Sequence, residues 1–175
     1  MIDGRLRNEP TRGRPVDEKW RAYRNTILEF EATPPLRIDL RERVTGDARA
    51  ALARLGLGAA FGVFTAENPV GENAEDAPSA HAELAKERAN ERREGALERD
   101  LRDRGVAYVR VDGVSPDGRY REHCVATPMA RDDAVALARR FGQLALFWYD
   151  GWAFWLLPAL AEKSVQRLPA SRSAG

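Results

Sequence analysis

The chain contains very little cysteine and histidine. Cys124 is the single cysteine among 175 residues, and only two histidines are present. One cysteine excludes an internal disulfide and a zinc site built from several cysteines, and the histidines lack the spacing of metal ligands. We therefore predict no metal site and no cofactor. Such cysteine usage is also typical of a reducing compartment, so we expect a cytoplasmic location.

Long apolar runs and an excess of one charge are also absent. No run reaches the about 18 apolar residues of a membrane span, and the first 15 residues contain no apolar stretch that would indicate a secretory signal. No glycine-rich phosphate-binding loop is present either. The formal net charge is +1, which does not call for a polyanionic partner. We expect neither a membrane nor a nucleic acid as partner.

What is present is the composition of a globular protein with 43% hydrophobic and 31% charged residues. We predict a disordered basic tail over residues 1–15, a single domain over 16–160 and a second disordered tail over 161–175, because both ends lack apolar periodicity. The alternative for the two ends is a pair of basic arms that bind a polyanion.

Apolar periodicity predicts interspersed helices and strands between the tails. We expect an α+β fold, a single mostly antiparallel sheet of about seven strands with helices packed over it. The expected order is a short helix, a hairpin, a helix, a strand, a long helix, a hairpin, a helix and a last hairpin. The expected ranges are a helix from residue 17, strands 26–31 and 36–40, a helix from 45 to 55, strand 59–65, helix 81–104, strands 106–111 and 119–127, a helix ending near 141, and strands 143–149 and 152–157.

Polar residues stand at two strand ends. Thr65 and Asn68 follow the buried strand, and Pro69 favours an extended backbone at Asn68. Gln143 lies between a helix cap and the next strand, where an amide can read a ligand as donor and acceptor. These side chains indicate a polar pocket. The alternatives are a turn that needs Asn and Pro for its geometry, and a glutamine that caps helix carbonyls.

The long helix carries two polar residues on its apolar stripe. Asn90 and Arg93 fall within about 40° of the face defined by Leu97 and Leu101. They point into a cleft beside the sheet, or the helix extends past the core and leaves them solvated. The other charges of residues 83–104 alternate in sign and indicate a solvated face with ion pairs.

The strand 119–127 carries a glutamate that can meet this helix. Glu122 and Cys124 share one face, and His123 faces the other way, so His123 and Cys124 cannot form a dyad. If Glu122 faces the helices, Arg93 is its natural partner, and burial would make Glu122 a weak candidate for a general base. The alternative is a surface glutamate.

Four motifs in this order resemble a known family. They are "FTAENPVGEN", "NERREGALERDL", "RYREHCVA" and "FGQLALFWYDG", and over residues 20–157 they resemble the bacterial family called domain of unknown function 3293 (DUF3293). The resemblance points to the same six polar positions: Thr65, Asn68, Asn90, Arg93, Glu122 and Gln143. It locates residues without naming a reaction. The chain departs from shorter members by a longer loop over residues 70–80.

Two functions are consistent with these residues. In the first, the six side chains bind a small polar or anionic molecule, such as a nucleotide-like metabolite, because arginine and amide groups suit it. In the second, they form a buried structural network, and the loop or the tails bind a partner protein. No nucleophile–base pair is visible, so the sequence does not decide whether the protein is an enzyme.

Overall fold

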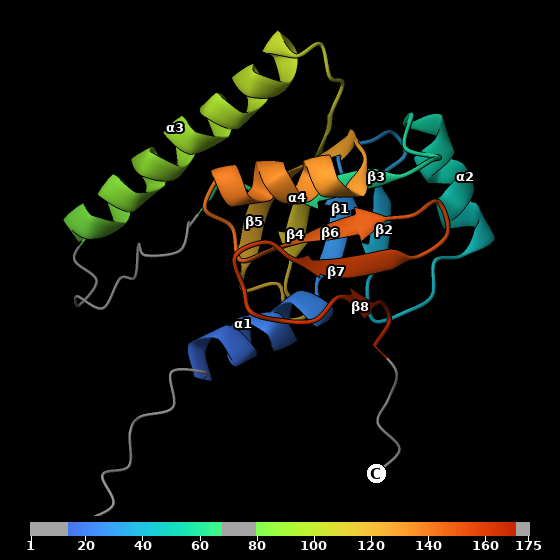
Figure 1. The fold of residues 1–175 in the computed structure, drawn as a ribbon, viewed down its shortest axis with the longest axis horizontal. Coiled ribbons are helices and arrows are strands. Elements are labelled where there is room, and N and C mark those ends of the chain that lie inside the picture. Colours follow the sequence, from blue (N-terminus) through green and yellow to red (C-terminus); the bar gives the residue numbers. More distant parts are fainter. Residues whose placement is uncertain (1–13, 68–79, 171–175) are drawn as a thin grey trace, which may run out of the picture.

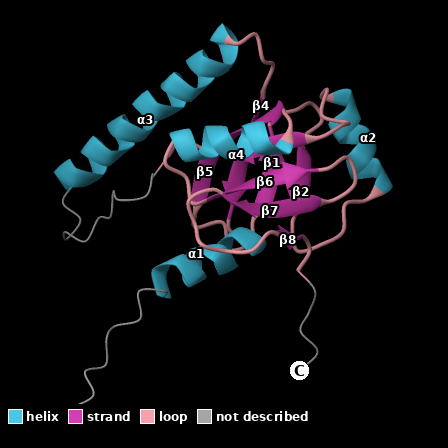
Figure 2. Cartoon of the chain, in the orientation of Figure 1, coloured by secondary structure: helices cyan, strands magenta, loops and turns pink. Residues whose placement is uncertain are grey.

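The computed structural model describes residues 14–67 and 80–170, and the statements below refer to these residues. They form four helices and eight strands (Figures 1 and 2). The helices are α1 (Arg14–Arg24), α2 (Gly46–Arg54), α3 (Ala80–Asp103) and α4 (Arg131–Arg140). The strands are β1 (Ile27–Phe30), β2 (Leu36–Asp39), β3 (Phe61–Phe64), β4 (Val109–Val114), β5 (Arg121–Pro128), β6 (Ala145–Tyr149), β7 (Phe154–Pro158) and β8 (Gln166–Arg167).

All strands belong to one antiparallel sheet in the order β2-β1-β4-β5-β3-β6-β7-β8. The predicted α+β fold is confirmed, as is the order of its elements. The sheet has one strand more than the expected seven or so, because β8 pairs with β7 through Gln166 and Arg167. We expected residues 161–170 to belong to a disordered tail, but they contain β8. Leu168, next to β8, is buried. The proposed single domain over 16–160 stays a prediction.

The sheet is apolar on both faces. Alternation along each strand sends one residue to each side, so Val63 packs with Trp20 of α1 and Leu52 of α2. Phe64, the next residue, packs with Leu97 of α3 and with residues of α4. Helices α1 and α2 therefore cover one face, and α3 and α4 cover the other.

Strand β3 lies near the middle of the sheet, between β5 and β6. All of its residues are buried because both faces are covered. Gly62 allows α4 to approach the sheet closely, since a Cβ atom at this position would lie 3.1 Å from the Cβ atom of Ala134. The predicted buried strand thus forms the centre of the fold.

The connection in the last hairpin is longer than the strand ranges expected from the sequence, 143–149 and 152–157, which leave only Asp150 and Gly151 between the strands. Residues 150–153 connect β6 to β7, and Asp150 Oδ1 accepts hydrogen bonds of 2.8 Å from the backbone N–H groups of Trp152 and Ala153. Trp152 is the first residue of the expected strand 152–157, but it lies in this connection and is 64% exposed. Its ring centroid lies 4.2 Å from the guanidinium carbon of Arg49. Because these hydrogen bonds to Asp150 fix the backbone of residues 152 and 153 in the connection, the side chain of Trp152 points to solvent.

We predict that Phe61→Ala lowers the free energy of unfolding by about 3–5 kcal/mol. Phe61 is fully buried, and its ring centroid lies 5.1 Å from that of Tyr149 and 5.8 Å from that of Phe154. Chemical denaturation checks the value. Trp152→Ala is the matched control and should change stability by less than about 0.5 kcal/mol; equal losses in both variants would contradict the assignment of the core.

Candidate functional site

The chain leaves the sheet at Thr65, and the next residues pass between the starts of β5 and β6. Pairing of β3 ends at Phe64 opposite Val125 and at Val63 opposite Phe147. Beyond this point side chains replace the strand ladder. The threonine at the end of the strand is the first of these side chains.

Glu67 is the residue that these side chains hold. Its backbone N–H donates to Thr65 Oγ1 at 3.0 Å, and its carbonyl accepts from Gln143 Nε2 at 2.9 Å. Gln143 Nε2 also donates to the carbonyl of Phe141 at 3.2 Å. Thr65 is 8% exposed and Gln143 is 6% exposed, so both hydrogen bonds are shielded from water. Two of the six predicted positions therefore fix the backbone of Glu67.

The carboxyl group of Glu67 lies among other acids. The residue is 9% exposed, and its carboxyl group is hydrogen-bonded to that of Glu94 on α3 and accepts the backbone N–H of His123. Burial, then the Glu94 carboxyl, then the charge of Glu122 raise the pKa of Glu67 well above its ordinary value of 4.5. The Glu67 carboxyl group, with its raised pKa, therefore keeps its proton at neutral pH.

Three of the predicted residues line one cavity, which we call the α1 cavity. It has a volume of about 340 Å³ and lies between α1 and the sheet, with Thr65, Glu122 and Gln143 in its wall. The other polar or titratable side chains of its wall are Lys19, Tyr23, Thr26, Ser115, Tyr120 and Cys124. Most of the remaining wall is apolar.

Two lining groups of the α1 cavity keep their protons. Burial, followed by the charge of Glu122, raises the pKa of the Tyr23 phenol. The same two causes raise the pKa of the Cys124 thiol. The phenol therefore offers a hydrogen-bond donor at neutral pH, and the thiol is not a reactive thiolate.

The other predicted residues lie elsewhere. Arg93 Nη1 donates to Asn90 Oδ1 at 3.0 Å, and both residues are half-buried on α3. Neither is in the wall of the α1 cavity, because α3 packs on the opposite face of the sheet through Leu97 and Leu101. Asn68 lies outside the described residues. The structure thus places Thr65, Glu122 and Gln143 together, and Asn90 with Arg93 apart from them.

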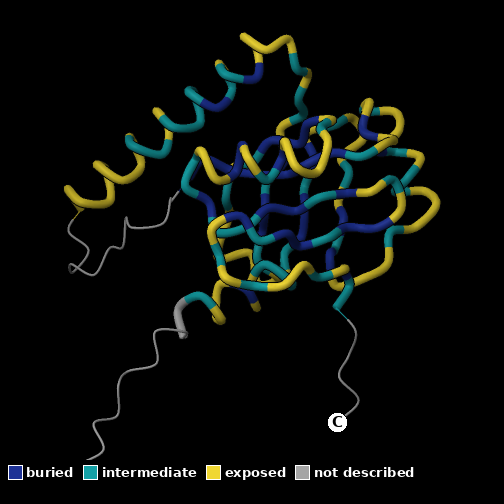
Figure 3. Tube along the Cα trace, in the orientation of Figure 1, coloured by how far each residue is buried: buried dark blue, intermediate teal, exposed yellow. Residues whose placement is uncertain are grey.

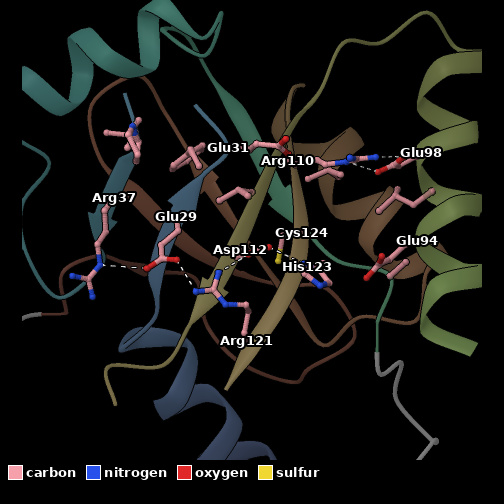
Figure 4. A pocket seen from close by; sticks show the side chains of 17 residues that line it. Glu29, Glu31, Arg37, Glu94, Glu98, Arg110, Asp112, Arg121, His123 and Cys124 are labelled. Carbon is pink, nitrogen blue, oxygen red and sulfur yellow. Dashed lines mark hydrogen bonds and ion pairs between the residues drawn. The ribbon is translucent and has the colours of Figure 1, made fainter. Parts of the chain in front are cut away.

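A second hollow, the α3 groove, separates α3 from β1, β4 and β5 (Figure 4). It has a volume of about 820 Å³. Its arginines pair with carboxylates. The ion pairs are Arg37–Glu29 at 3.7 Å, Arg121–Glu29 at 2.8 Å, Arg121–Asp112 at 2.5 Å and Arg110–Glu98 at 3.1 Å. In addition, His123 Nδ1 lies 2.8 Å from Asp112 Oδ1. Glu94 projects into this groove from α3 (Figure 4).

Sequence reasoning missed Glu67 and Glu94. Glu67 occupies the variable position of the Thr-Ala-x-Asn-Pro motif, and Glu94 directly follows Arg93 within a run of charges that indicated a solvated face. The available signal was weak: a glutamate two residues after a buried strand, next to a threonine that can accept its N–H. Because Glu67 follows a central strand so closely, its side chain is buried in the protein.

Among residues 14–67 and 80–170, no group of three or more His, Cys, Asp or Glu side chains is arranged to hold a metal ion. No helix in the same part of the chain is both long and apolar enough to cross a membrane.

A comparison with family models finds one matching model. Residues 64–146 match the model of DUF3293, described as a protein of unknown function. This confirms the resemblance from Phe64, the last residue of β3, through α3, β4, β5 and α4 to the start of β6. The matched DUF3293 region is shorter than the expected 20–157, and it contains all six predicted positions. Comparisons with curated proteins and with solved structures give no match.

We predict that Thr65→Val and Gln143→Leu each lower the free energy of unfolding by about 1–3 kcal/mol, because each leaves a buried backbone group of Glu67 without its partner. Their effects should be non-additive in a double-mutant cycle, since both side chains hold the same residue. Denaturation of the two single variants and the double variant measures this. Thr33→Val, at an exposed position, is the control; strict additivity would contradict the shared role.

We also predict that Glu67→Gln changes how stability depends on pH. Above pH 4.5, the ordinary pKa of the carboxyl group, the unfolded chain has lost the proton that the folded protein keeps. Stability of the wild type therefore falls as pH rises, by up to about 1.4 kcal/mol per pH unit for one proton. Glutamine has no such proton, so the advantage of the variant should grow with pH.

Thermal unfolding over a pH series measures the difference between Glu67→Gln and the wild type. Glu91→Gln, at an exposed position of α3, is the control and should follow the wild type throughout. Parallel curves for Glu67→Gln and the wild type would contradict a retained proton.

Proposed function

We propose that the protein binds a small polar molecule in the α1 cavity. The observation that carries this proposal is the convergence of Thr65, Glu122 and Gln143, from three separate elements, on one hollow of about 340 Å³. This volume falls within the about 300–1,000 Å³ of small-molecule sites. A mostly apolar wall with a few polar groups is also typical of such sites.

The charges of the wall favour a neutral or positively charged ligand. Glu122 and Lys19 are the charged side chains among the described lining residues. Lys19 is exposed, so Glu122 is the charge that an enclosed ligand would meet. The negative charge of this carboxylate would attract a hydrogen-bond donor or cation on the ligand, with the apolar body of the ligand against Phe147 and Leu156. Glu122 is also our candidate for a general base.

The expected anionic, nucleotide-like ligand is less favoured. That expectation depended on Arg93 as the group that binds an anion, and Arg93 is not in the wall of the α1 cavity. The α3 groove is larger but less suited to a small ligand, because its arginines already pair with carboxylates. We therefore keep the small polar ligand and revise its charge.

The second candidate is a protein-interaction module in which the polar residues are structural. The hydrogen bonds from Thr65 and Gln143 to the backbone of Glu67 favour it. In that case substitutions at these positions lower stability, and the α1 cavity has no ligand. Glu122 distinguishes the two candidates, since the ligand proposal gives it a direct role in binding.

A series of benzylamine, benzyl alcohol and benzoate tests the proposal by ligand-observed NMR. The three probes share one ring and differ in charge. We expect binding in the order amine, alcohol, benzoate, because Glu122 attracts a cation and repels an anion. Glu122→Gln should remove the preference for the amine. Ala145 lines the cavity, so Ala145→Leu should reduce the free volume and weaken the binding of all three probes.

Glu91→Gln on the exposed face of α3 is the control for charge and should leave the order unchanged. Absence of binding for all three probes, or binding that Ala145→Leu does not affect, would exclude the α1 cavity as the site.

A further inference from the structure

Tyr23 is an aromatic side chain of α1 in the wall of the α1 cavity. Residues 17–19 and 21–22 of this helix are exposed, whereas Trp20 is buried and Tyr23 is half-buried (Figure 3). The ring centroid of Tyr23 lies 6.4 Å from that of Trp20 and 6.4 Å from that of Phe147, both edge to face. This is a favourable arrangement of aromatic pairs. The two contacts fix the ring and therefore the position of its hydroxyl group.

The hydroxyl group of Tyr23 has no hydrogen-bond partner in the part of the chain that the structure describes. Tyr149, by comparison, donates to the carbonyl of Gly151 at 2.9 Å, as a buried tyrosine usually does. Among the described side chains, the buried nitrogen or oxygen atom without a partner is Asp100 Oδ2. The Tyr23 hydroxyl group is therefore not sealed among apolar atoms. Because the residue lines the α1 cavity, this group opens into that cavity.

Other hydrogen-bond donors of the same wall already have acceptors. Thr26 Oγ1 donates to a backbone carbonyl of α1 at 3.3 Å, and Ser115 Oγ donates to Asp117 Oδ1 at 2.6 Å. The amide of Gln143 donates to the two backbone carbonyls described above. Tyr23 differs from these residues, because its O–H group remains available to a bound molecule.

Glu122 contributes the complementary group from β5. It lines the same cavity, and its charge is, after burial, the second cause that raises the pKa of the Tyr23 phenol. A protonated phenol donates a hydrogen bond, and a carboxylate accepts only. A ligand that meets both groups needs an acceptor and a donor. The acceptor is uncharged, because Glu122 repels an anion.

We propose that Tyr23 and Glu122 select a ligand whose polar end is a carboxamide. Its carbonyl oxygen accepts the O–H group of Tyr23, and its N–H group donates to Glu122, so one neutral group satisfies both requirements. This inference depends on the proposed binding of a small molecule in the α1 cavity, and it names the chemical class of that molecule. The cavity of about 340 Å³ is at the lower end of the about 300–1,000 Å³ of small-molecule sites, which suits a carboxamide on a single ring.

Tyr23→Phe tests the proposal by NMR titration with benzamide, acetophenone and toluene. The probes share one ring: benzamide has a carbonyl and an N–H group, acetophenone has the carbonyl alone, and toluene has neither. We expect Tyr23→Phe to raise the Kd of benzamide and of acetophenone about 3- to 10-fold, the effect of one lost hydrogen bond. The Kd of toluene should change less than about 2-fold, because the ring of residue 23 is retained.

Tyr149→Phe is the matched control, since it also removes one phenol hydroxyl group. Tyr149 is not in the described wall of the α1 cavity, and its hydroxyl group has a structural partner. Tyr149→Phe should therefore lower the Tm and leave the affinity for benzamide unchanged. Tyr23→Phe should show the opposite pattern: the Tm of the ligand-free protein is unchanged or raised, and the affinity falls.

Two results would overturn the role of Tyr23 alone. One is equal affinity of Tyr23→Phe and the wild type for benzamide, while toluene still binds and Ala145→Leu weakens it. The other is a fall in the Tm of ligand-free Tyr23→Phe as large as that of Tyr149→Phe, which would show that the hydroxyl group is structural. Absence of binding for all three probes would reject both this inference and the proposed function.

Discussion

The hydrogen bond from Gln143 Nε2 to the carbonyl of Glu67 replaces the strand ladder where β3 ends. The sheet is continuous up to Val63 and Phe64, and beyond them the chain has no strand partner to follow. The side-chain amide of Gln143, just before β6, and the hydroxyl group of Thr65, just after β3, fix the next turn of the backbone. An unpaired backbone group at this depth would cost about 1–3 kcal/mol, so this bond determines where the chain goes.

The position of Glu67 follows from that bond, and it joins the two faces of the sheet. Glu122 lines the α1 cavity on one face, and Glu94 lines the α3 groove on the other. Glu67 interacts with both carboxyl groups. The carboxyl group of Glu67 thus lies within electrostatic reach of an acidic side chain on each face of the sheet.

Much of the fold could be predicted from the sequence because its elements have strong periodicity. The alternation in β1 and β2, the apolar run of β3 and the charge pattern of α3 each identify an element. Strand β8 has two residues, Gln166 and Arg167, and no periodicity can identify so short a strand. Its place against β7 comes from the burial of Leu168, which is a tertiary effect.

The site was harder to predict than the fold. Alternation showed that Glu122 and Cys124 share a face, but not which helices cover that face. The side chain of Glu122 lines the cavity beside α1. Arg93 belongs to α3, which packs on the opposite face of the sheet. Thr65 and Gln143 were found because each is a polar residue at the end or the entrance of a strand, a common location of sites. Their partners are the backbone N–H and carbonyl groups of Glu67. Every residue has such groups, so the sequence does not show which of them a side chain will bind.

The two outermost strands of the sheet, β2 and β8, expose a row of backbone groups to other chains. Both strands are short, and a proline lies beside each of them, Pro35 before β2 and Pro169 after Leu168. Proline has no N–H group to donate. A regular ladder with another chain therefore cannot continue through Pro35 at β2 or through Pro169 at β8. The charged side chains of Arg37 and Arg167 add repulsion between copies. Each edge therefore offers another chain only a short row of backbone groups next to a proline, which disfavours templated growth of the sheet.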